Sequence, residues 1–232
     1  MNQTKPIELY FWTTPNGFKV SIALEEMGVP YDIHFIAIGR GDQFKPEFLK
    51  IAPNNKIPAI IDPEGPDGQP ISIFESGAIL AYLGRKFGKL YPTDERKRVA
   101  VDEWLFWQMA GVGPIFGNNH HFRNYAKEKI PYAIDRFVNE THRLYGVLNK
   151  RLEGREFVAD EYSIADIAIF PWSRNAQNRG IDIEEFPNVK RWLAAIEARP
   201  AVQKGLAIKP PLDINLATDD QAQKILFGQR AS

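Results

Sequence analysis

The first part of the chain alternates between two spacings of apolar side chains, one typical of strands and one typical of helices. Residues 7–12 form a short apolar and aromatic run that stops at TTPNG (residues 13–17), a sequence typical of a turn. Residues 18–27 carry apolar side chains at helical spacing and end at Gly28. Residues 31–38 alternate like a second strand. This order predicts a β-α-β unit at the start of the chain.

A second pair of short β-rich runs follows, at residues 59–62 and 71–74, with a loop rich in Pro, Gly and Asp between them. This pattern predicts a β-hairpin, and Ser76 then begins a helix that we expect to end near residue 87. These elements pack naturally as a four-stranded mixed sheet with helices on its faces. The predicted arrangement is therefore thioredoxin-like.

The rest of the chain carries only the helical spacing. Residues 95–112 and 132–152 place apolar side chains at i, i+3 and i+4, which predicts the helices of a bundle. Residues 163–177 are apolar on nearly every side, so we expect a buried central helix that is kinked at Pro171. A further helix is expected over residues 189–198.

These patterns divide the chain into segments of different character. We predict a thioredoxin-like domain at residues 5–89, a linker at 90–94, an all-helical domain at 95–210 and a C-terminal tail at 211–232. The tail follows two prolines and is rich in Asp and Gln, so we expect it on the surface. The predicted fold class is an α/β thioredoxin-like domain followed by an all-α helical bundle.

Composition and charge exclude several kinds of chemistry. The 232 residues contain no cysteine, which excludes a disulfide, a thiolate metal site and a cysteine nucleophile of the protein's own. The chain has 29 basic and 29 acidic residues, interleaved, so we expect no binding to nucleic acid or to a membrane. We find neither a signal peptide pattern nor an apolar run near the roughly 18 residues that span a bilayer. A soluble, cytoplasmic protein is expected.

Two junctions between a strand and a helix offer sites for an anion. In TTPNG, Thr14 or Asn16 can cap the helix, whose first N–H groups also favour a thiolate. In the sequence FES, Ser76 at a helix start suits a carboxylate, and Glu75 beside it suits an ammonium group. Both junctions have a plainer interpretation, which is that the residues cap a helix and do nothing more.

The segment NNKIPAI, at residues 54–60, stands just before a predicted strand. A proline at the start of a strand is a candidate cis peptide, so Pro58 could turn the backbone of Ile57 toward an extended peptide ligand. An ordinary trans proline at a strand edge is the alternative.

Two other sequences favour structural roles. Ser163 and Asp166 have the S-x-x-D spacing of a capping box, whose reciprocal hydrogen bonds would satisfy the buried start of a helix. His120 and His121 have no third ligand at the spacing of a zinc site, so we interpret them as part of a loop or pocket wall. We expect no metal.

Taken in order, these motifs resemble those of the cytosolic glutathione transferases over roughly residues 7–208. TTPNG, NNKIPAI and the later segments WLFWQMAGVGPIFGNNHHF and PYAIDRF look most like the Nu class of bacterial, glutathione-dependent disulfide-bond reductases. The resemblance implies a homodimer of the glutathione transferase fold, with a helical domain that walls the second-substrate pocket. It further implies an oxidoreductase that binds glutathione as co-substrate and uses its thiolate on small disulfides, with one or two glutathione molecules bound.

The resemblance also assigns roles to residues. It places Thr14 and Asn16 at the glutathione sulfur as the catalytic pair, the Ile57 backbone at the cysteinyl part, and the Glu75 and Ser76 pair at the γ-glutamyl end. Gln43 and Lys56 look placed for the glycyl carboxylate, and Arg136 resembles an anchor for a second glutathione. The implied glutathione-binding set is Thr13, Asn16, Gln43, Lys56, Ile57, Pro58, Glu75, Ser76 and Arg136.

One departure from the family bears on the chemistry. Tyr10 lies too early in the first strand to match the hydroxyl that usually activates the thiol, which leaves Thr13 or Thr14 as the hydroxyl and Asn16 as an amide donor. Two alternatives stay open. One is a glutathione transferase or peroxidase that acts on electrophiles or organic hydroperoxides, and the other is a non-catalytic binding or regulatory protein of the same fold.

Overall fold

The computed structural model describes residues 4–212, 214 and 218–229. The chain forms two compact units, of which the first contains Met1–Tyr82 with Lys204–Ser232 and the second Leu83–Gln203. The C-terminal segment, which the sequence pattern sets apart as a tail, thus belongs to the same unit as the sheet. Among the described helices, none combines the length and apolar character that a bilayer crossing demands.

The first unit is built on a four-stranded sheet in the order β2-β1-β3-β4. β1 pairs with β2 in parallel and with β3 in antiparallel register, and β3 and β4 form an antiparallel hairpin. The predicted mixed sheet and hairpin are confirmed. The strands are β1 (Ile7–Phe11), β2 (Tyr31–Phe35), β3 (Ala59–Asp62) and β4 (Ile71–Phe74).

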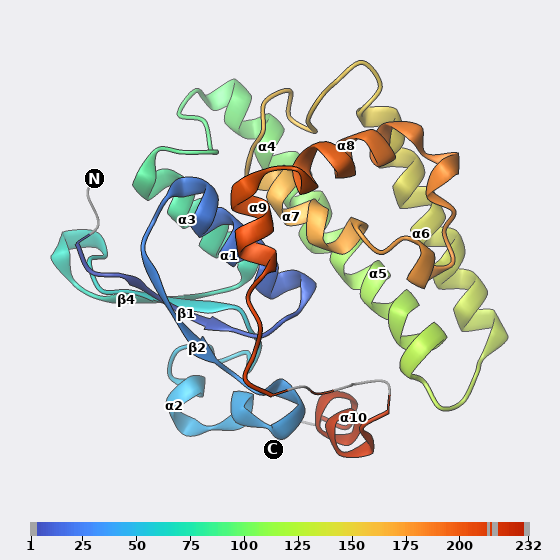
Figure 1. Ribbon diagram of the computed structural model, residues 1–232, viewed down its shortest axis with the longest axis horizontal. Helices are drawn as coiled ribbons and strands as arrows, with labels where there is room; N and C mark the ends of the chain where they lie inside the picture. The colour runs from blue at the N-terminus through green and yellow to red at the C-terminus, as the bar shows by residue number, and fades with distance from the viewer. Residues whose placement is uncertain (1–3, 213, 215–217, 230–232) are drawn as a thin grey trace. The chain divides into compact units, whose positions relative to one another are not determined.

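Successive side chains of β1 point to opposite faces of this sheet, and helices cover both faces. Leu9 and Phe11 are fully buried on one face, where the Phe11 ring lies 5.7 Å from Phe18 of α1 (Pro15–Met27). α3 (Ser76–Phe87) lies beside α1 on this face (Figure 1). On the opposite face, Tyr10 packs against Phe48 of α2 (Pro46–Leu49), 6.0 Å between ring centroids.

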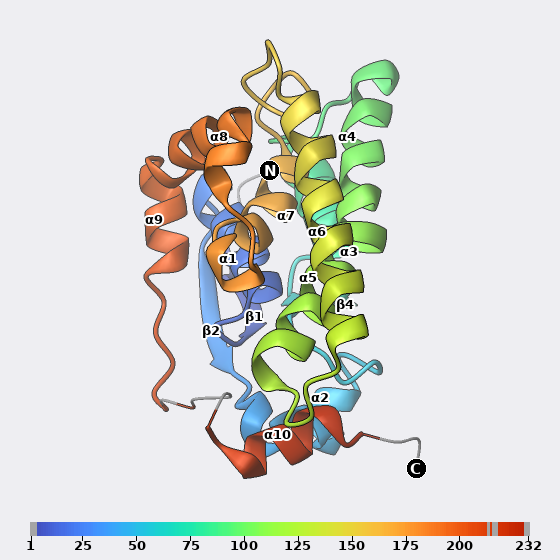
Figure 2. The ribbon, with the colours of Figure 1, turned by 90° about the vertical axis from the view of Figure 1, so that its right-hand side faces the viewer.

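The C-terminal segment forms a helix, α10 (Asp220–Phe227), that the sequence pattern did not predict. It packs against η1 (Ile38–Arg40), as Figures 1 and 2 show, and Ala222 is fully buried there. Gly39 permits this close approach, since a Cβ at that position would lie 3.0 Å from the Ala222 Cβ. Asp219 caps α10 by accepting from the Ala222 N–H at 2.9 Å and pairs with Arg40 Nη1 at 2.8 Å.

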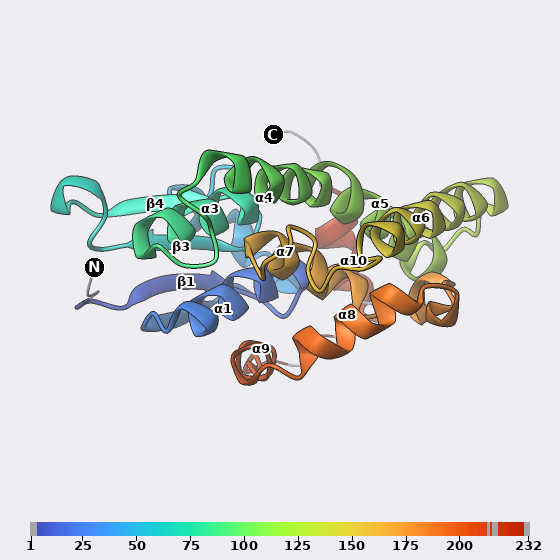
Figure 3. The ribbon, with the colours of Figure 1, turned by 90° about the horizontal axis from the view of Figure 1, so that it is seen from above.

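The second unit is helical, as predicted. Its central element, α7 (Ile164–Ser173), lies between α4 (Glu95–Trp107) and α8 (Pro187–Glu197), as Figure 3 shows. The α7 residues from Ile164 to Phe170 are fully buried. Pro171 lies inside α7, which ends four residues earlier than predicted. The other helices of this unit are α4, η4 (Gln108–Val112), α5 (Gly113–His120), η5 (His121–Tyr125), α6 (Pro131–Arg151) and α8, with short 3-10 turns η6 (Gln177–Arg179) and η7 (Ile183–Glu185) before α8. The next helix, α9 (Pro200–Leu206), begins in the second unit and ends in the first.

The expectation of a loop at the two histidines was wrong, while the alternative of a pocket wall stays a prediction. His120 ends α5 and His121 begins the π-helical turn η5, so this stretch is helical rather than a loop. The π-helical turn η4 likewise interrupts the helix that was predicted to run to residue 112. α5 begins with Gly and Pro, which are poor helix formers, so the sequence pattern did not predict it. A proline is nevertheless well tolerated in the first turn of a helix.

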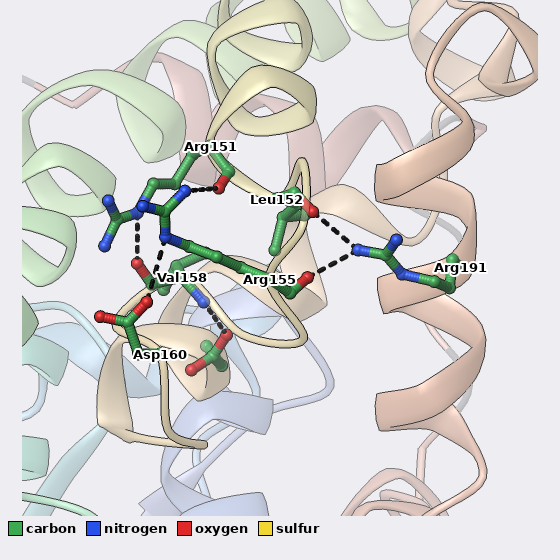
Figure 4. A network of polar contacts seen from close by, with 7 residues as sticks. Arg151, Leu152, Arg155, Val158, Asp160 and Arg191 are labelled. Atoms are coloured by element: carbon green, nitrogen blue, oxygen red, sulfur yellow. Dashed lines mark hydrogen bonds and ion pairs between the residues drawn. The ribbon is translucent and has the colours of Figure 1, made fainter.

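Arginine side chains hold the loop that leads from α6 into α7 (Figure 4). Arg191 of α8 donates to the carbonyls of Leu152 at 2.7 Å and Arg155 at 2.6 Å. Arg151 donates to the carbonyl of Val158 at 2.7 Å. These hydrogen bonds satisfy backbone oxygens of the loop and present the Val158 N–H to the start of α7.

The predicted capping box at the start of α7 is confirmed. Asp166 accepts from the Ser163 N–H at 3.1 Å, and the Ser163 hydroxyl accepts from the Ala165 N–H at 3.3 Å. The fully buried Asp166 carboxylate also accepts from the Val158 N–H at 3.0 Å and from the Trp192 indole at 2.9 Å. Burial raises the pKa of Asp166 to about 6, against the opposite effect of these hydrogen bonds. Asp166 therefore joins α7, α8 and the preceding loop.

Replacing this carboxylate should strongly destabilise the protein. Asp166→Ala leaves three buried N–H donors without an acceptor, and each such loss costs about 1 to 3 kcal/mol, so the free energy of unfolding should fall by about 3 kcal/mol or more. Urea denaturation measures this value. Glu156→Ala, which removes an exposed carboxylate of the same loop, should change it by less than about 0.5 kcal/mol. A small effect of Asp166→Ala would contradict the structural role.

A charge placed at Ala222 should release α10. Because Ala222 is fully buried, Ala222→Arg would need either a buried unpaired charge or an undocked helix, and undocking costs less. The neighbouring Gln221 is exposed, so Gln221→Arg serves as the matched control. Limited proteolysis should cleave the Ala222→Arg variant near residues 218–229 at least about tenfold faster than the control. Equal rates would show that α10 is not held by this contact.

Candidate functional site

A pocket of about 130 Å³ lies in the first unit, where three segments that flank the strands meet. It joins the start of α1, the segment before β3 and the turn between β4 and α3. Six of the nine predicted glutathione-binding residues line it. The lining residues are Asn16, Asn54, Lys56, Ile57, Pro58, Phe74, Glu75 and Ser76.

The start of α1 is shaped by a cap and a close backbone contact. Thr14 has extended backbone angles at the N-cap, and its hydroxyl accepts from the Gly17 N–H at 3.1 Å. Gly17 has no space for a side chain, since a Cβ would lie 2.2 Å from the Trp12 carbonyl oxygen. Asn16 thereby reaches the pocket from the first turn of the helix, where backbone N–H groups and the helix dipole favour an anion. Thr13 and Thr14 are half-buried beside the pocket lining.

Tyr10 takes no part in this arrangement. Its ring stacks on His34 at 4.8 Å and its hydroxyl donates to Glu8 at 3.0 Å, on the face of the sheet that α2 covers. Burial and the Glu8 carboxylate raise the pKa of Tyr10 to about 12. Tyr10 therefore does not supply a hydroxyl to the pocket, as the sequence analysis expected.

The segment before β3 lines the pocket and contains a cis proline. The Ile57-Pro58 peptide bond is cis, so the trans alternative for NNKIPAI was wrong. The pairing of the Ile57 backbone with a ligand stays a prediction. Ile57 also packs against the buried cluster of Phe48, Ala52 and Ala59, so the segment is anchored by apolar contacts below the pocket.

The turn between β4 and α3 holds an acidic residue in an unusual conformation. Glu75 has φ of +69°, in the left-handed region that costs a non-glycine residue about 1 to 3 kcal/mol. Such outliers cluster at functional sites. The Asn54 amide donates to the Glu75 carboxylate at 3.5 Å, and this first Asn of NNKIPAI was missed by the sequence analysis. Ser76, the first residue of α3, is only 6% exposed.

A buried lysine lies directly behind Ser76. The ammonium of Lys19 donates to the Ser76 hydroxyl at 3.2 Å, and the Lys19 side chain is 1% exposed. Burial lowers the pKa of Lys19 to about 7, and the negative charge of Glu75 acts in the opposite direction. The sequence analysis missed Lys19, although a lysine at helical spacing from the apolar Ile22 and Ala23 was a signal for a buried charge.

Lys56 is the cation on the rim of the pocket. Its ammonium donates to Gln229 at 3.2 Å, just beyond α10, and partial desolvation lowers the pKa of Lys56. The C-terminal segment therefore reaches a residue that lines the pocket.

Two other predicted residues are not brought to the pocket lining. Gln43 is 2% exposed and its amide donates to the Ile38 carbonyl at 3.0 Å. Arg136 is exposed on α6 of the second unit, 3.8 Å from Glu140. Their roles in binding glutathione stay predictions. Across the described residues, no group of three or more His, Cys, Asp or Glu side chains could hold a metal ion.

Comparisons with known proteins show what the two parts of the chain are similar to. The family description "Glutathione S-transferase, N-terminal domain" matches residues 13–86, and "Glutathione S-transferase, C-terminal domain" matches residues 121–200. The disulfide-bond oxidoreductase YfcG of Escherichia coli is 50% identical over 202 residues, which span 86% of this chain and 94% of YfcG.

Solved structures of similar proteins contain glutathione. A glutathione transferase from Burkholderia graminis, with two glutathione molecules bound per subunit, is 51% identical with a TM-score of 0.83 and covers 87% of each chain. A glutathione transferase from Pseudomonas putida, with one glutathione disulfide bound per subunit, is 46% identical with a TM-score of 0.86, covering 90% of this chain and 94% of the other. The family matches, the fold and these relatives together show that the chain belongs to the glutathione S-transferase family.

Proposed function

We propose that this protein is a glutathione-dependent disulfide-bond reductase, which binds glutathione in the pocket of the first unit and uses its thiolate on small disulfides. The observation that carries the proposal is that TTPNG, NNKIPAI and FES meet at one pocket in a chain without cysteine. The reacting sulfur must then come from a substrate. The relatives that are named disulfide-bond oxidoreductase or hold glutathione disulfide support this reaction class.

The pocket offers a complementary group for each part of glutathione. The Ser76 hydroxyl and the first N–H groups of α3 suit the α-carboxylate of the γ-glutamyl end, and Glu75 suits its ammonium. The Ile57 backbone suits the cysteinyl part, as in a strand addition. Lys56 suits the glycyl carboxylate. With the glutathione chain laid in this direction, Asn16 lies at the thiol.

The task of the site is to favour the thiolate. A thiol of this kind has a pKa near 8.5, so only a few per cent is ionised at pH 7. Lowering the pKa by about two units requires about 2.7 kcal/mol of preferential stabilisation. One charge-assisted hydrogen bond contributes about 1.5 to 3 kcal/mol and a helix N-terminus about 0.3 to 1 kcal/mol. Asn16 or Thr14 together with the start of α1 can therefore supply enough.

The reaction then follows thiol–disulfide exchange. The bound thiolate attacks one sulfur of the substrate disulfide, forms a mixed disulfide with it and releases the other half as a thiolate, which takes up a proton. A second glutathione attacks the glutathione sulfur of the mixed disulfide, which yields glutathione disulfide and the second thiol. We propose that Arg136 helps to hold this second glutathione. We also propose that the protein works as a cytoplasmic homodimer.

The disulfide reductase activity can be measured directly. Purified protein with glutathione should reduce 2-hydroxyethyl disulfide well above the uncatalysed rate, followed through coupled reduction of glutathione disulfide. Parallel assays with 1-chloro-2,4-dinitrobenzene and cumene hydroperoxide test the transferase and peroxidase alternative. Disulfide reduction at the background rate would overturn the proposal, and glutathione binding without any turnover would favour a binding or regulatory role.

Asn16 should matter more for turnover than Thr13. Asn16 lines the pocket and Thr13 does not, so Asn16→Ala should lower kcat/KM by about 10- to 100-fold while Thr13→Ala changes it by less than about threefold. The fold is expected to survive both changes, which circular dichroism checks. Equal and mild effects would indicate that backbone N–H groups, and not the Asn16 amide, stabilise the sulfur.

A further inference from the structure

We propose that Lys19 is a positioning residue of the glutathione pocket, which directs the Ser76 hydroxyl toward the ligand carboxylate and takes up a proton when that carboxylate binds. This inference rests on the proposed binding of glutathione and concerns the γ-glutamyl end of the site. Lys19 does not line the pocket, so it acts through Ser76, which does.

The contact between Lys19 and Ser76 has only one orientation when the lysine is charged. An ammonium group carries donors and no acceptor, so the Ser76 oxygen accepts from it at 3.2 Å. The Ser76 hydroxyl keeps its own proton, which it can donate to a carboxylate bound in the pocket that Ser76 lines. A neutral amine has a lone pair and can instead accept that proton, which turns the hydroxyl away from the pocket. The charge of Lys19 therefore selects the orientation that binds an anion.

The surroundings of Lys19 make this charge sensitive to a ligand. The Lys19 side chain is 1% exposed, and the negative charge of Glu75, in the turn before α3, acts on its ammonium. The β1 residues on the α1 face, Leu9 and Phe11, are apolar. β3 contributes Asp62 to this face of the sheet, where Asp62 accepts from Tyr82 of α3 at 2.5 Å.

A carboxylate bound at Ser76 adds a second negative charge next to Lys19. Because burial has lowered the pKa of Lys19 to about 7, the ligand-free protein near neutral pH contains both the charged and the neutral amine. The bound carboxylate favours the charged form and raises the pKa. By linkage, binding takes up a proton above pH 7, and affinity falls as pH rises from about 7 toward the raised pKa of the complex. Below about pH 6.5 the lysine is already charged and affinity should be constant.

Proton uptake on binding tests this inference without any variant. The probe is S-methylglutathione, whose sulfur cannot ionise, titrated calorimetrically at pH 6.0 and pH 7.8 in buffers of different ionisation enthalpy. We expect uptake of 0.5 to 1 proton per site at pH 7.8, roughly none at pH 6.0, and a several-fold weaker Kd at the higher pH. Binding with no proton uptake at pH 7.8 would overturn the inference alone, whereas absence of binding at both pH values would also overturn the proposed function.

Variants then assign the proton to this lysine. Lys19→Arg keeps a charge that does not titrate, so it should bind at pH 6.0 within about threefold of the original protein and abolish both the uptake and the pH dependence of Kd. Lys19→Met should also abolish the uptake and weaken binding about tenfold or more at pH 6.0. Lys50→Met removes an exposed lysine of the same unit and should leave all three readouts unchanged. Undiminished proton uptake in Lys19→Arg would show that another group titrates.

Discussion

The antiparallel pairing of β3 with both β1 and β4 is the constraint on which the site depends. Ala59, at the start of β3, lies opposite Tyr10 near the end of β1 and opposite Phe74 at the end of β4. The segment before β3 and the segments after β1 and β4 must therefore meet at one edge of the sheet. A slip of one residue would turn every side chain of the strand to the other face, so the register that buries Ile60 also aligns the pocket.

The strand ends bring the pocket segments together, and the starts of two helices make the pocket favourable for an anion. α1 and α3 both begin at this edge, so the positive ends of both helix dipoles lie beside the same pocket. Thr14 caps α1 shortly before the pocket residue Asn16, and Ser76, the first residue of α3, lines the pocket itself. The plain interpretation of these motifs as helix caps and the functional interpretation do not exclude one another.

The two buried charged side chains, Asp166 and Lys19, differ in the groups that they contact. Asp166 in the second unit accepts hydrogen bonds from backbone and indole donors, which makes it a structural junction between helices. Lys19 in the first unit contacts the hydroxyl of a pocket residue, and its charge depends on what lies in front of that hydroxyl. A charge that is held by fixed donors contributes to stability, while one that faces a ligand can respond to binding.

Much of this protein was determined by local sequence. The strands, the hairpin and the capping box follow from periodicity, turn residues and short motifs, because each depends on neighbours a few positions away. The cis bond at Pro58, which the sequence left open, was decided by the structure. Docking of α10 on Gly39, the contact between Asn54 and Glu75, and the burial of Lys19 behind Ser76 join residues far apart in the chain. Only tertiary structure could decide these, since burial and the resulting electrostatics arise from which surfaces pack together and not from the residues alone.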